Sequence, residues 1–312
     1  MQLKKLTNEE LPDYEYHGEE YKDFLSGSEL WGFIDKCPAE QVYGEKKQKA
    51  SYVTGSAVHS EVLEMHTFSD LYYRGYETKD EDIRTQIGVK AKLKQLGIPA
   101  SAKGGFWAWC CSILIAEPET SIEEINDLLV DYENIGKTKL KPEGYDMAKD
   151  MREQLINYSS YGEYVEKGEC EHSIIGEIEI NGRLVKVKTR PDIIYNGSIT
   201  NYKTTANAKP DKIIMDAFNY GYLMKEYFNA IVFEAMYGYF PDVHLMCQSK
   251  NKPYVVTGIK LTNEQLEIGR IQFEKAFALW SACKDAGAYI DYAQGEWLEV
   301  ETPQWMVSKT VN

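Results

Sequence analysis

The dipeptide Asn196-Gly197 constrains the fold of this chain most strongly, because it stands between two short runs that favour β-strands. Ile193-Ile194-Tyr195 precedes it and Ser198-Ile199-Thr200 follows it. Asn-Gly between such runs is the strongest short-range signal for a hairpin with a two-residue turn. The sequence therefore predicts two adjacent antiparallel strands with a defined register.

The predicted register gathers three polar side chains. Asp192 precedes the first strand and lies almost opposite Asn201 on the second, and Asn201 and Lys203 share one face of that strand. Hard divalent cations such as Mg²⁺ take oxygen ligands and also bind substrate phosphates. A neighbouring lysine can orient an attacking water or stabilise charge on a phosphate. This is the arrangement that a metal-dependent nuclease requires; the alternative is a surface hairpin with scattered polar residues.

Other segments carry residues that could join this site. Gly55-Ser56-Ala57-Val58-His59 leads into an expected helix that carries one histidine. Gly168-Glu169-Cys170-Glu171 opens an expected strand that carries a further carboxylate. Imidazole and carboxylate groups are common ligands of divalent metals.

In their order and spacing, these segments resemble the RecB-like branch of the PD-(D/E)XK nucleases, and within it the RecE (exonuclease VIII) group of phage and prophage exonucleases. The resemblance spans roughly residues 20–240. It implies an α/β fold with a PD-(D/E)XK restriction-endonuclease-like core, in which helices flank a small mixed sheet, with a helical insertion. The motifs that carry it most closely are Gly136-Lys137-Thr138, Pro142-Glu143, Glu171-His172-Ser173, Arg190-Pro191-Asp192, Lys203-Thr204-Thr205 and Tyr237-Gly238.

The resemblance implies a role for each matching residue. His59 would help to hold a metal ion, and Asp192 would be the principal metal-binding aspartate. Tyr202 would offer its backbone carbonyl to the metal. Lys203 would be the catalytic lysine, and Glu171 would support the metal or its waters.

Two positions depart from the family pattern. Asn201 stands where the family has its second metal-binding carboxylate, and the family's helix motif Gln-x-x-x-Tyr falls on Lys225 and Asn229. The Asn201 amide keeps an oxygen that can contact a metal but removes one negative charge, so Mg²⁺ should bind more weakly. Two explanations fit: a deliberate Asp-to-Asn change made to trap a complex, or a natural variant that binds DNA without cutting it well.

The resemblance implies a Mg²⁺- or Mn²⁺-dependent exonuclease that degrades one strand from double-stranded DNA ends, 5′ to 3′, in phage-type recombination. Activity would be low or absent because of Asn201. The family also implies a homo-oligomer, a trimer or tetramer, and a single-strand annealing protein as partner. A second hypothesis is a non-cleaving protein that binds DNA ends or a protein partner and has a degenerate nuclease site.

The charge distribution partly resolves a conflict with DNA binding. The net charge is −14, from 35 basic and 49 acidic residues, whereas DNA-binding domains are usually basic. Residues 183–212, however, contain seven basic residues and only two acids. A basic lining within an acidic exterior would focus the electric field on the path of the DNA. We therefore predict phosphate contacts from Lys188, Arg190, Lys209 and Lys225.

Composition restricts location and cofactors. No stretch approaches the roughly 20 apolar residues of a membrane span, and residues 1–10 lack the apolar core of a signal peptide. We expect a protein of the bacterial host cytoplasm without membrane contact. Relatives that hold an iron–sulfur cluster use a cysteine near Cys37 and three clustered C-terminal cysteines. Here only Cys247 and Cys283 lie C-terminal, so we predict no iron–sulfur cluster.

We expect a single nuclease-like domain over residues 1–312, because the chain has no internal repeat and no low-complexity linker. A long helix is expected from about residue 209 to 237. The expected parts are an N-terminal arm (1–20), a mostly helical insertion (76–165), the catalytic core sheet (168–261) and a C-terminal helix (262–286).

Overall fold

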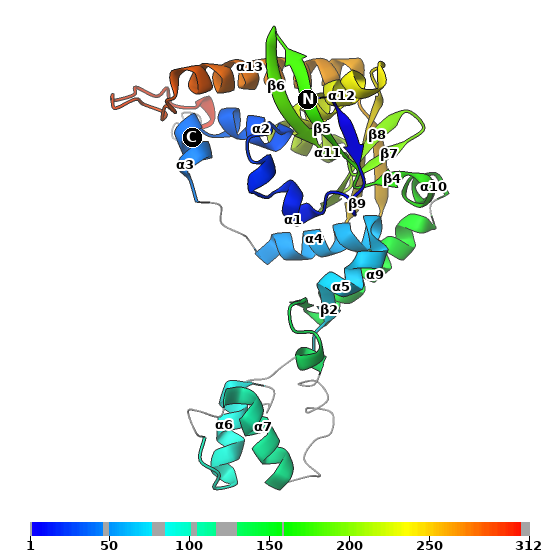
Figure 1. Cartoon of the computed structure of the whole chain (residues 1–312), viewed down its shortest axis with the longest axis vertical. Coiled ribbons are helices and arrows are strands. Elements are labelled where there is room, and N and C mark those ends of the chain that lie inside the picture. Colours follow the sequence, from blue (N-terminus) through cyan, green and yellow to red (C-terminus); the bar gives the residue numbers. More distant parts are fainter. Residues whose placement is uncertain are drawn as a thin grey trace.

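A five-stranded mixed sheet lies at the centre of the main body, in the strand order β10-β9-β8-β7-β4 (Figure 1). The computed structural model of the chain describes residues 2–45, 50–76, 85–100, 105–116, 130–157 and 159–306. β7 and β8 are antiparallel, whereas β8 and β9 are parallel. The strands are β4 (Glu169–Cys170), β7 (Ile193–Tyr195), β8 (Ser198–Thr205), β9 (Asp242–Ser249) and β10 (Val256–Lys260).

Helices cover both faces of this sheet, so the expected α/β class with a small mixed sheet flanked by helices is confirmed. Four helices contribute to the buried cluster on one face: α2 (Gly27–Asp35), α11 (Pro210–Asn219), α12 (Tyr222–Tyr237) and α13 (Asn263–Ala286). Four others contribute to the cluster on the opposite face: α4 (Ala50–Leu63), α5 (Met65–Leu71), α9 (Pro142–Ile156) and α10 (Ser159–Lys167). The short helix α3 (Pro38–Tyr43) follows α2.

The predicted hairpin is present with the predicted register. Asn196 and Gly197 both have left-handed backbone angles, with φ of 47° and 75°, which is the requirement of a type I′ turn. Ile193 pairs with Thr200 across the two strands. Asp192 and Asn201 therefore follow as the next opposed pair.

Alternate side chains of β8 face different helical layers. Ile199 belongs to the buried cluster that includes α12, whereas Tyr202 belongs to the cluster that includes α4. Because side chains alternate along a strand, Asn201 and Lys203 lie on the face toward α12. The side chain of Tyr202 therefore lies on the α4 side of the sheet, and those of Asn201 and Lys203 lie on the α12 side.

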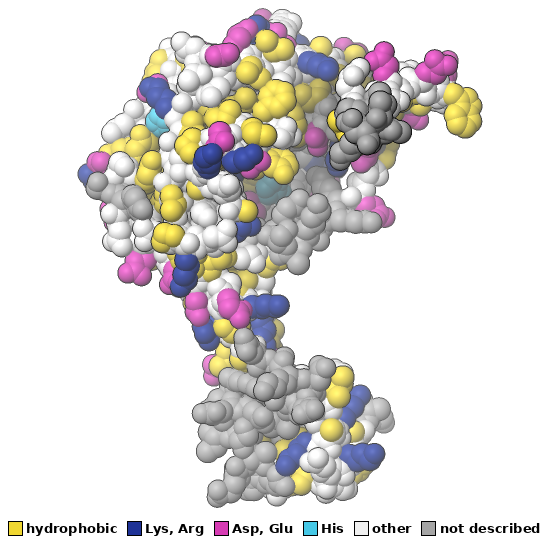
Figure 2. All heavy atoms as spheres, turned by 180° about the vertical axis from the view of Figure 1, so that it is seen from behind, with side chains coloured by type: hydrophobic (Ala, Val, Ile, Leu, Met, Phe, Trp, Pro, Cys, Tyr) yellow, Lys and Arg dark blue, Asp and Glu magenta, His cyan; other side chains and the backbone are white. Residues whose placement is uncertain are grey.

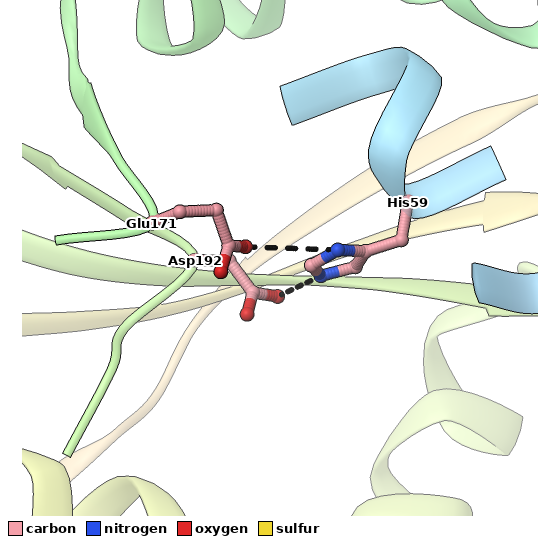
Figure 3. A group of neighbouring side chains, drawn as sticks. All are labelled: His59, Glu171 and Asp192. Carbon is pink, nitrogen blue, oxygen red and sulfur yellow. Dashed lines mark ion pairs between the residues drawn. The ribbon is translucent and has the colours of Figure 1, made fainter. Parts of the chain in front are cut away.

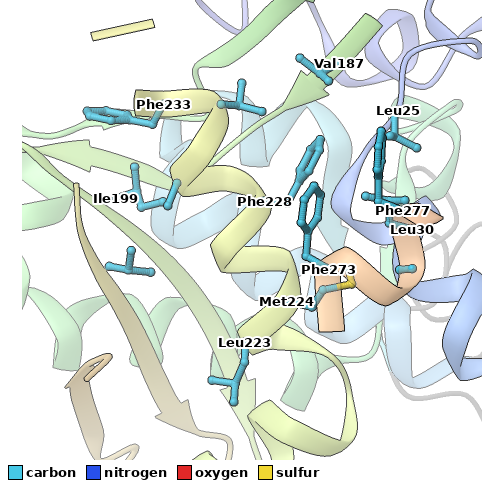
Figure 4. Packing of buried hydrophobic residues seen from close by; sticks show 14 of the residues in the cluster. Leu25, Leu30, Val187, Ile199, Leu223, Met224, Phe228, Phe233, Phe273 and Phe277 are labelled. Carbon is cyan, nitrogen blue, oxygen red and sulfur yellow. The ribbon is translucent and has the colours of Figure 1, made fainter. Parts of the chain in front are cut away.

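Large aromatic side chains fill the space between α12 and α13 (Figure 4). Phe228 of α12 lies against Phe273 of α13, and the rings of Phe273 and Phe277 stack with centroids 5.8 Å apart. Burial of such rings removes much apolar area from water and stabilises the fold. A capping box between Thr262 and Gln265 starts α13. This packing holds α12 over the face of β8 that carries Asn201 and Lys203.

The N-terminal residues are not an extended arm. β1 (Lys4–Leu6) pairs antiparallel with β5 (Ser173–Ile180), which pairs in turn with β6 (Arg183–Thr189) in a three-stranded sheet. The short helix α1 (Asp13–Tyr16) and the 3₁₀ turn η1 (Glu19–Tyr21) follow. Leu11 and Tyr16 are buried. The apolar side chains spaced along residues 3–25 explain the difference, because they bury against β5 and β6.

The expected helical insertion is divided between two places. α6 (Gln86–Gln95) and α7 (Gly105–Ala116) pack against each other and lie apart from the main body, at the bottom of Figure 1. β2 (Tyr72–Arg74) and β3 (Thr138–Leu140) pair in parallel between the two bodies. α9 and α10 instead pack on the central sheet. Residues 77–84, 101–104, 117–129 and 158 lie outside the described residues.

The long helix expected between residues 209 and 237 is interrupted. α11 ends at Asn219 and α12 begins at Tyr222, with Gly221 between them at φ 68°. A Cβ atom on Gly221 would overlap the ring of Trp31. A larger residue at this break would therefore meet Trp31 of α2, which is distant in sequence. Within the described part of the chain, no helix combines the length and apolar character needed to cross a bilayer.

We predict that Gly221→Ala destabilises the protein more than Gly287→Ala does. Both glycines have left-handed backbone angles, which cost an L-residue roughly 1–2 kcal/mol. The space around Gly287 is open, whereas Gly221 meets Trp31, so overpacking should add at least about 1 kcal/mol at Gly221. Urea denaturation of both variants would measure the difference. Equal losses in the two variants would contradict the steric explanation.

Candidate metal centre

Asp192 is the centre of the polar site. It directly precedes β7, and its backbone N–H donates to Oδ1 of Asn201 at 3.1 Å. Its carboxylate Oδ2 accepts hydrogen bonds from the Tyr202 N–H at 2.6 Å and from Lys203 Nζ at 3.0 Å. Burial alone would favour the neutral acid, but Lys203 and His59 hold the pKa of Asp192 far below its usual range. Asp192 is therefore an ionised carboxylate inside the protein.

His59 and Glu171 complete a compact group around this carboxylate (Figure 3). His59 projects from α4, with Nε2 3.2 Å from Asp192 Oδ2 and Nδ1 3.6 Å from Glu171 Oε1. One potential ligand atom from each of the three residues lies within 4.8 Å of the others. α4 packs against α9 and β8, so the expected proximity of His59 to the hairpin follows from helix packing.

Glu171 carries the strongest sign that a cation belongs here. It lies at φ 54° on the bend between β4 and β5, and only 8% of it is exposed. Its Oε1 is buried and has no hydrogen-bond partner among the described residues. Burial raises the pKa of Glu171 to about 8, against a lowering effect of His59. His59 Nδ1, 3.6 Å away, is an ion-pair partner of this oxygen, but a buried carboxylate oxygen without a hydrogen bond is costly unless a further group compensates it.

The donor set fits a divalent cation of the Mg²⁺ or Mn²⁺ type. Asp192 and Glu171 offer carboxylate oxygens, and His59 offers a ring nitrogen. Oxygen-rich sites suit Mg²⁺ and Mn²⁺, and imidazole is a common ligand of divalent metals. These three residues could hold such an ion together with waters.

Lys203 lies beside this group as a cation. Its Nζ donates to Asp192 Oδ2 and, at 3.0 Å, to the backbone carbonyl of Tyr202. Burial alone would lower the pKa of Lys203, but Asp192 and Glu226 hold it above its usual range. The ammonium group can therefore attract a phosphate or orient a water molecule next to the ionised Asp192.

Asn201 has two partners within the protein. Its amide oxygen accepts from the Asp192 N–H, and its amide nitrogen donates to Oε2 of Glu226 on α12. Asn229 Nδ2 donates to the same Glu226 oxygen at 3.2 Å. Both polar atoms of the Asn201 side chain are thus engaged within the protein, and these hydrogen bonds would compete with the expected contact of Asn201 with a metal. Its side chain links β8 to α12.

Tyr202 contributes to the site mainly through its backbone. Its N–H donates to Asp192, and its carbonyl accepts from Lys203. Its hydroxyl donates to Gln248 Oε1 at 2.6 Å on the α4 side of the sheet. The proposed use of the Tyr202 carbonyl as a metal ligand stays a prediction.

Two of the four residues expected to contact DNA instead anchor the N-terminal segment. Lys188 Nζ donates to the carbonyl of Tyr16 at 2.8 Å, and Arg190 Nη2 donates to the carbonyl of Leu11 at 2.7 Å. The guanidinium of Arg190 also lies over the Tyr16 ring. Both side chains are largely buried. The sequence suggested exposed phosphate ligands because it did not reveal that the N-terminal residues fold over this strand.

The other two candidates differ in exposure. Lys225 is half-buried and donates to the carbonyl of Tyr220 at 3.0 Å. Burial lowers its pKa. Lys209 is exposed, with its Nζ 3.5 Å from Asp211. Lys225 also lines the cavity that contains Asp192 and Lys203, whereas Lys209 does not.

Glu226 is the site residue that the sequence did not reveal. It lies on α12, is 2% exposed, and lines a cavity of about 270 Å³ together with Asp192, Asn201 and Lys203. Burial raises its pKa to about 7, against a lowering effect of Lys203. The expected helix motif fell on Lys225, one position earlier. An acidic residue within the apolar stretch from Leu223 to Phe228 was the available signal.

Comparison with known proteins establishes the family. The model of the PDDEXK-like domain of unknown function (DUF3799) matches residues 20–294. The chain therefore belongs to this family, and the wider PD-(D/E)XK resemblance is confirmed. No curated protein matches the chain.

Solved structures support the fold. The crystal structure of a "putative exonuclease" from Eubacterium rectale aligns with a TM-score of 0.53, over 96% of this chain and 98% of that chain, at 13% identity. At this identity the likeness shows the fold alone. The structure of the protein SSO0001 aligns with a TM-score of 0.26 and 15% identity, over 75% of this chain and 88% of that chain. A TM-score this low supports no conclusion.

We predict that Glu171→Gln changes the pH dependence of stability in the absence of metal. The folded protein keeps the Glu171 proton up to a pKa of about 8, whereas the ordinary value is 4.5. Between these values the folded state binds more protons, so the free energy of unfolding falls as pH rises, by at most about 1.4 kcal/mol per pH unit. Glutamine cannot lose this proton.

Urea denaturation in EDTA across this pH window checks the prediction. The variant should gain stability relative to the wild type as pH rises, with most of the gain complete near pH 8. Parallel stability curves for the two proteins would show that Glu171 does not hold a proton in the folded state.

Proposed function

We propose that this protein is a divalent-metal-dependent nuclease that acts on DNA. The observation that carries the proposal is the cluster of His59, Glu171 and Asp192, together with the hydrogen bond from the ammonium group of Lys203 to the Asp192 carboxylate. These residues come from α4, the β4–β5 bend and the β7–β8 hairpin. Membership of a PDDEXK-like family supports the same chemistry.

The side chains divide the work as follows. Asp192 and Glu171 supply negative charge for a cation, and the ring of His59 is oriented between them. A bound metal would polarise the scissile phosphate and lower the pKa of a bound water. Lys203 positions the attacking water or stabilises negative charge that develops on the phosphate. Its contact with Asp192 keeps the ammonium group at the reacting centre.

A second cavity next to Lys203 supports a path for a phosphate backbone. It has a volume of about 330 Å³, and its lining includes Lys203, Lys212 and Lys250. On the face seen from behind, lysine and arginine side chains are scattered among acidic and apolar ones over the main body (Figure 2). A local group of lysines within an acidic protein can focus the field on bound DNA.

The finer assignment is exonuclease action on double-stranded DNA ends, 5′ to 3′, with Mg²⁺ or Mn²⁺, in phage-type recombination. The RecE-like order of motifs supports it, as does the name of the structurally similar protein from Eubacterium rectale. A homo-oligomer and a single-strand annealing partner are further proposals that rest on the same resemblance.

A second candidate is a protein that binds DNA ends, or a protein partner, without cleavage. Asn201 favours it, because this position lacks the carboxylate of the family pattern. The two candidates differ in whether linear duplex DNA is degraded or only bound.

Degradation of end-labelled linear duplex DNA tests the nuclease proposal. We expect metal-dependent release of nucleotides from the 5′-labelled strand, and a loss of at least about 100-fold in Asp192→Asn. Asp242→Asn on β9, an exposed aspartate paired with Lys260, is the matched control and should retain activity. Binding without degradation in either metal would favour the second candidate. Equal activity in EDTA would exclude this site as its source.

We also predict that the double variant with Lys212→Gln and Lys250→Gln binds duplex DNA more weakly, whatever the base sequence of the DNA. Removing two phosphate contacts should reduce the slope of log affinity against log salt by about 2. Fluorescence anisotropy over a salt series measures the slope. Lys260→Gln removes an exposed lysine paired with Asp242 and should leave the slope unchanged. An unchanged slope in the double variant would exclude this cavity from the DNA path.

A further inference from the structure

We infer that Glu226 supplies the metal-binding carboxylate that the family pattern places at position 201, so that this acid comes from helix α12 instead of strand β8. Asn201 is then a positioning residue that holds the Glu226 carboxylate. This inference rests on the proposed function, because it assigns a further ligand to the same site.

The two ends of the Asn201 amide have different partners, and only an amide satisfies both. The oxygen accepts from the backbone N–H of Asp192, and the nitrogen donates to the carboxylate of Glu226. An ionised carboxylate has acceptors only, so it could not donate to Glu226. The residue at position 201 is therefore matched to a carboxylate on the facing helix.

The environment of Glu226 makes a purely structural role costly. The side chain is 2% exposed and belongs to a helix whose neighbouring residues Leu223 and Phe228 are buried in the hydrophobic core. Burying a carboxylate is unfavourable unless it is paired or binds a metal. Asn201 and Asn229 both donate to the same oxygen, Oε2. The two amides orient the group, and the ammonium group of Lys203 lines the same cavity.

Glu226 also shares a cavity with the hairpin residues of the site. It lines the same 270 Å³ space as Asp192 and Lys203. The charge that is missing at Asn201 is thus present on α12, 25 residues later in the chain.

This arrangement bears on the identity of residue 201. Asn201→Asp would place a second buried carboxylate in contact with that of Glu226, and repulsion between the two negative charges would destabilise the folded protein. The present pair instead forms a donor–acceptor contact. The amide at position 201 is therefore compatible with a carboxylate at position 226.

Titration with Mn²⁺, followed by electron paramagnetic resonance and by calorimetry, tests this assignment. We expect Glu226→Gln to weaken Mn²⁺ binding about tenfold or more, because affinity follows the number of charged ligands. Asn201→Asp alone should lower the melting temperature of the metal-free protein. The double variant Asn201→Asp with Glu226→Gln restores one acid and one amide in exchanged positions, and should bind Mn²⁺ within about threefold of wild type.

Glu234→Gln is the matched control, since it removes one charge from the exposed part of the same helix. Its Mn²⁺ affinity should equal that of the wild type. Unchanged Mn²⁺ affinity in Glu226→Gln would overturn the inference. The glutamine in Glu226→Gln has nearly the same shape as glutamate and can still accept a hydrogen bond from Asn201. If either single variant folds poorly, the double variant Asn201→Asp with Glu226→Gln provides a second test.

The same measurements separate this inference from the proposed function. Wild-type protein that binds Mn²⁺ through Glu226 but does not degrade DNA would overturn the nuclease proposal alone. Wild-type protein that degrades DNA while Glu226→Gln binds Mn²⁺ normally would overturn the inference alone. Absence of Mn²⁺ binding in the wild type would overturn both.

Discussion

The site depends on the hydrogen bonds that the Asp192 carboxylate accepts from Tyr202 and Lys203. Oδ2 of Asp192 accepts from the Tyr202 N–H and from Lys203 Nζ, and His59 Nε2 lies 3.2 Å away. The contact requires the register that the Asn196-Gly197 turn imposes, because a slip of one residue would turn Lys203 to the other face. A local turn thereby determines the position of the reactive groups.

The site forms where the two helical layers meet at the end of the hairpin. α4 brings His59 from one side of the sheet, and α12 brings Glu226 from the other. Side-chain alternation along β8 directs Asn201 and Lys203 to the α12 side, where Glu226 accepts from Asn201. Helix α12 therefore contributes to both the hydrophobic core and the polar site. Its aromatic side chains pack on α13, and this packing helps to position the Glu226 carboxylate.

The N-terminal segment changes how the basic residues are used. Lys188 and Arg190 lie on or next to β6 near the site, but their polar groups bind carbonyls of residues 11 and 16. Their charges hold the segment that carries Tyr16 against the body. Lys212 and Lys250 instead line a cavity next to Lys203, and this is the phosphate path that we propose.

The sequence by itself determined the hairpin, its register and the grouping of Asp192, Asn201 and Lys203, because turn chemistry and strand alternation act over a few residues. The family resemblance also pointed to His59 and Glu171, whose roles at a metal stay predictions. Only the tertiary structure decided that Glu226 faces Asn201, that Gly221 breaks a helix against Trp31, and that Lys188 and Arg190 bind the N-terminal segment. These contacts join segments far apart in the chain, and they depend on packing that no local pattern encodes.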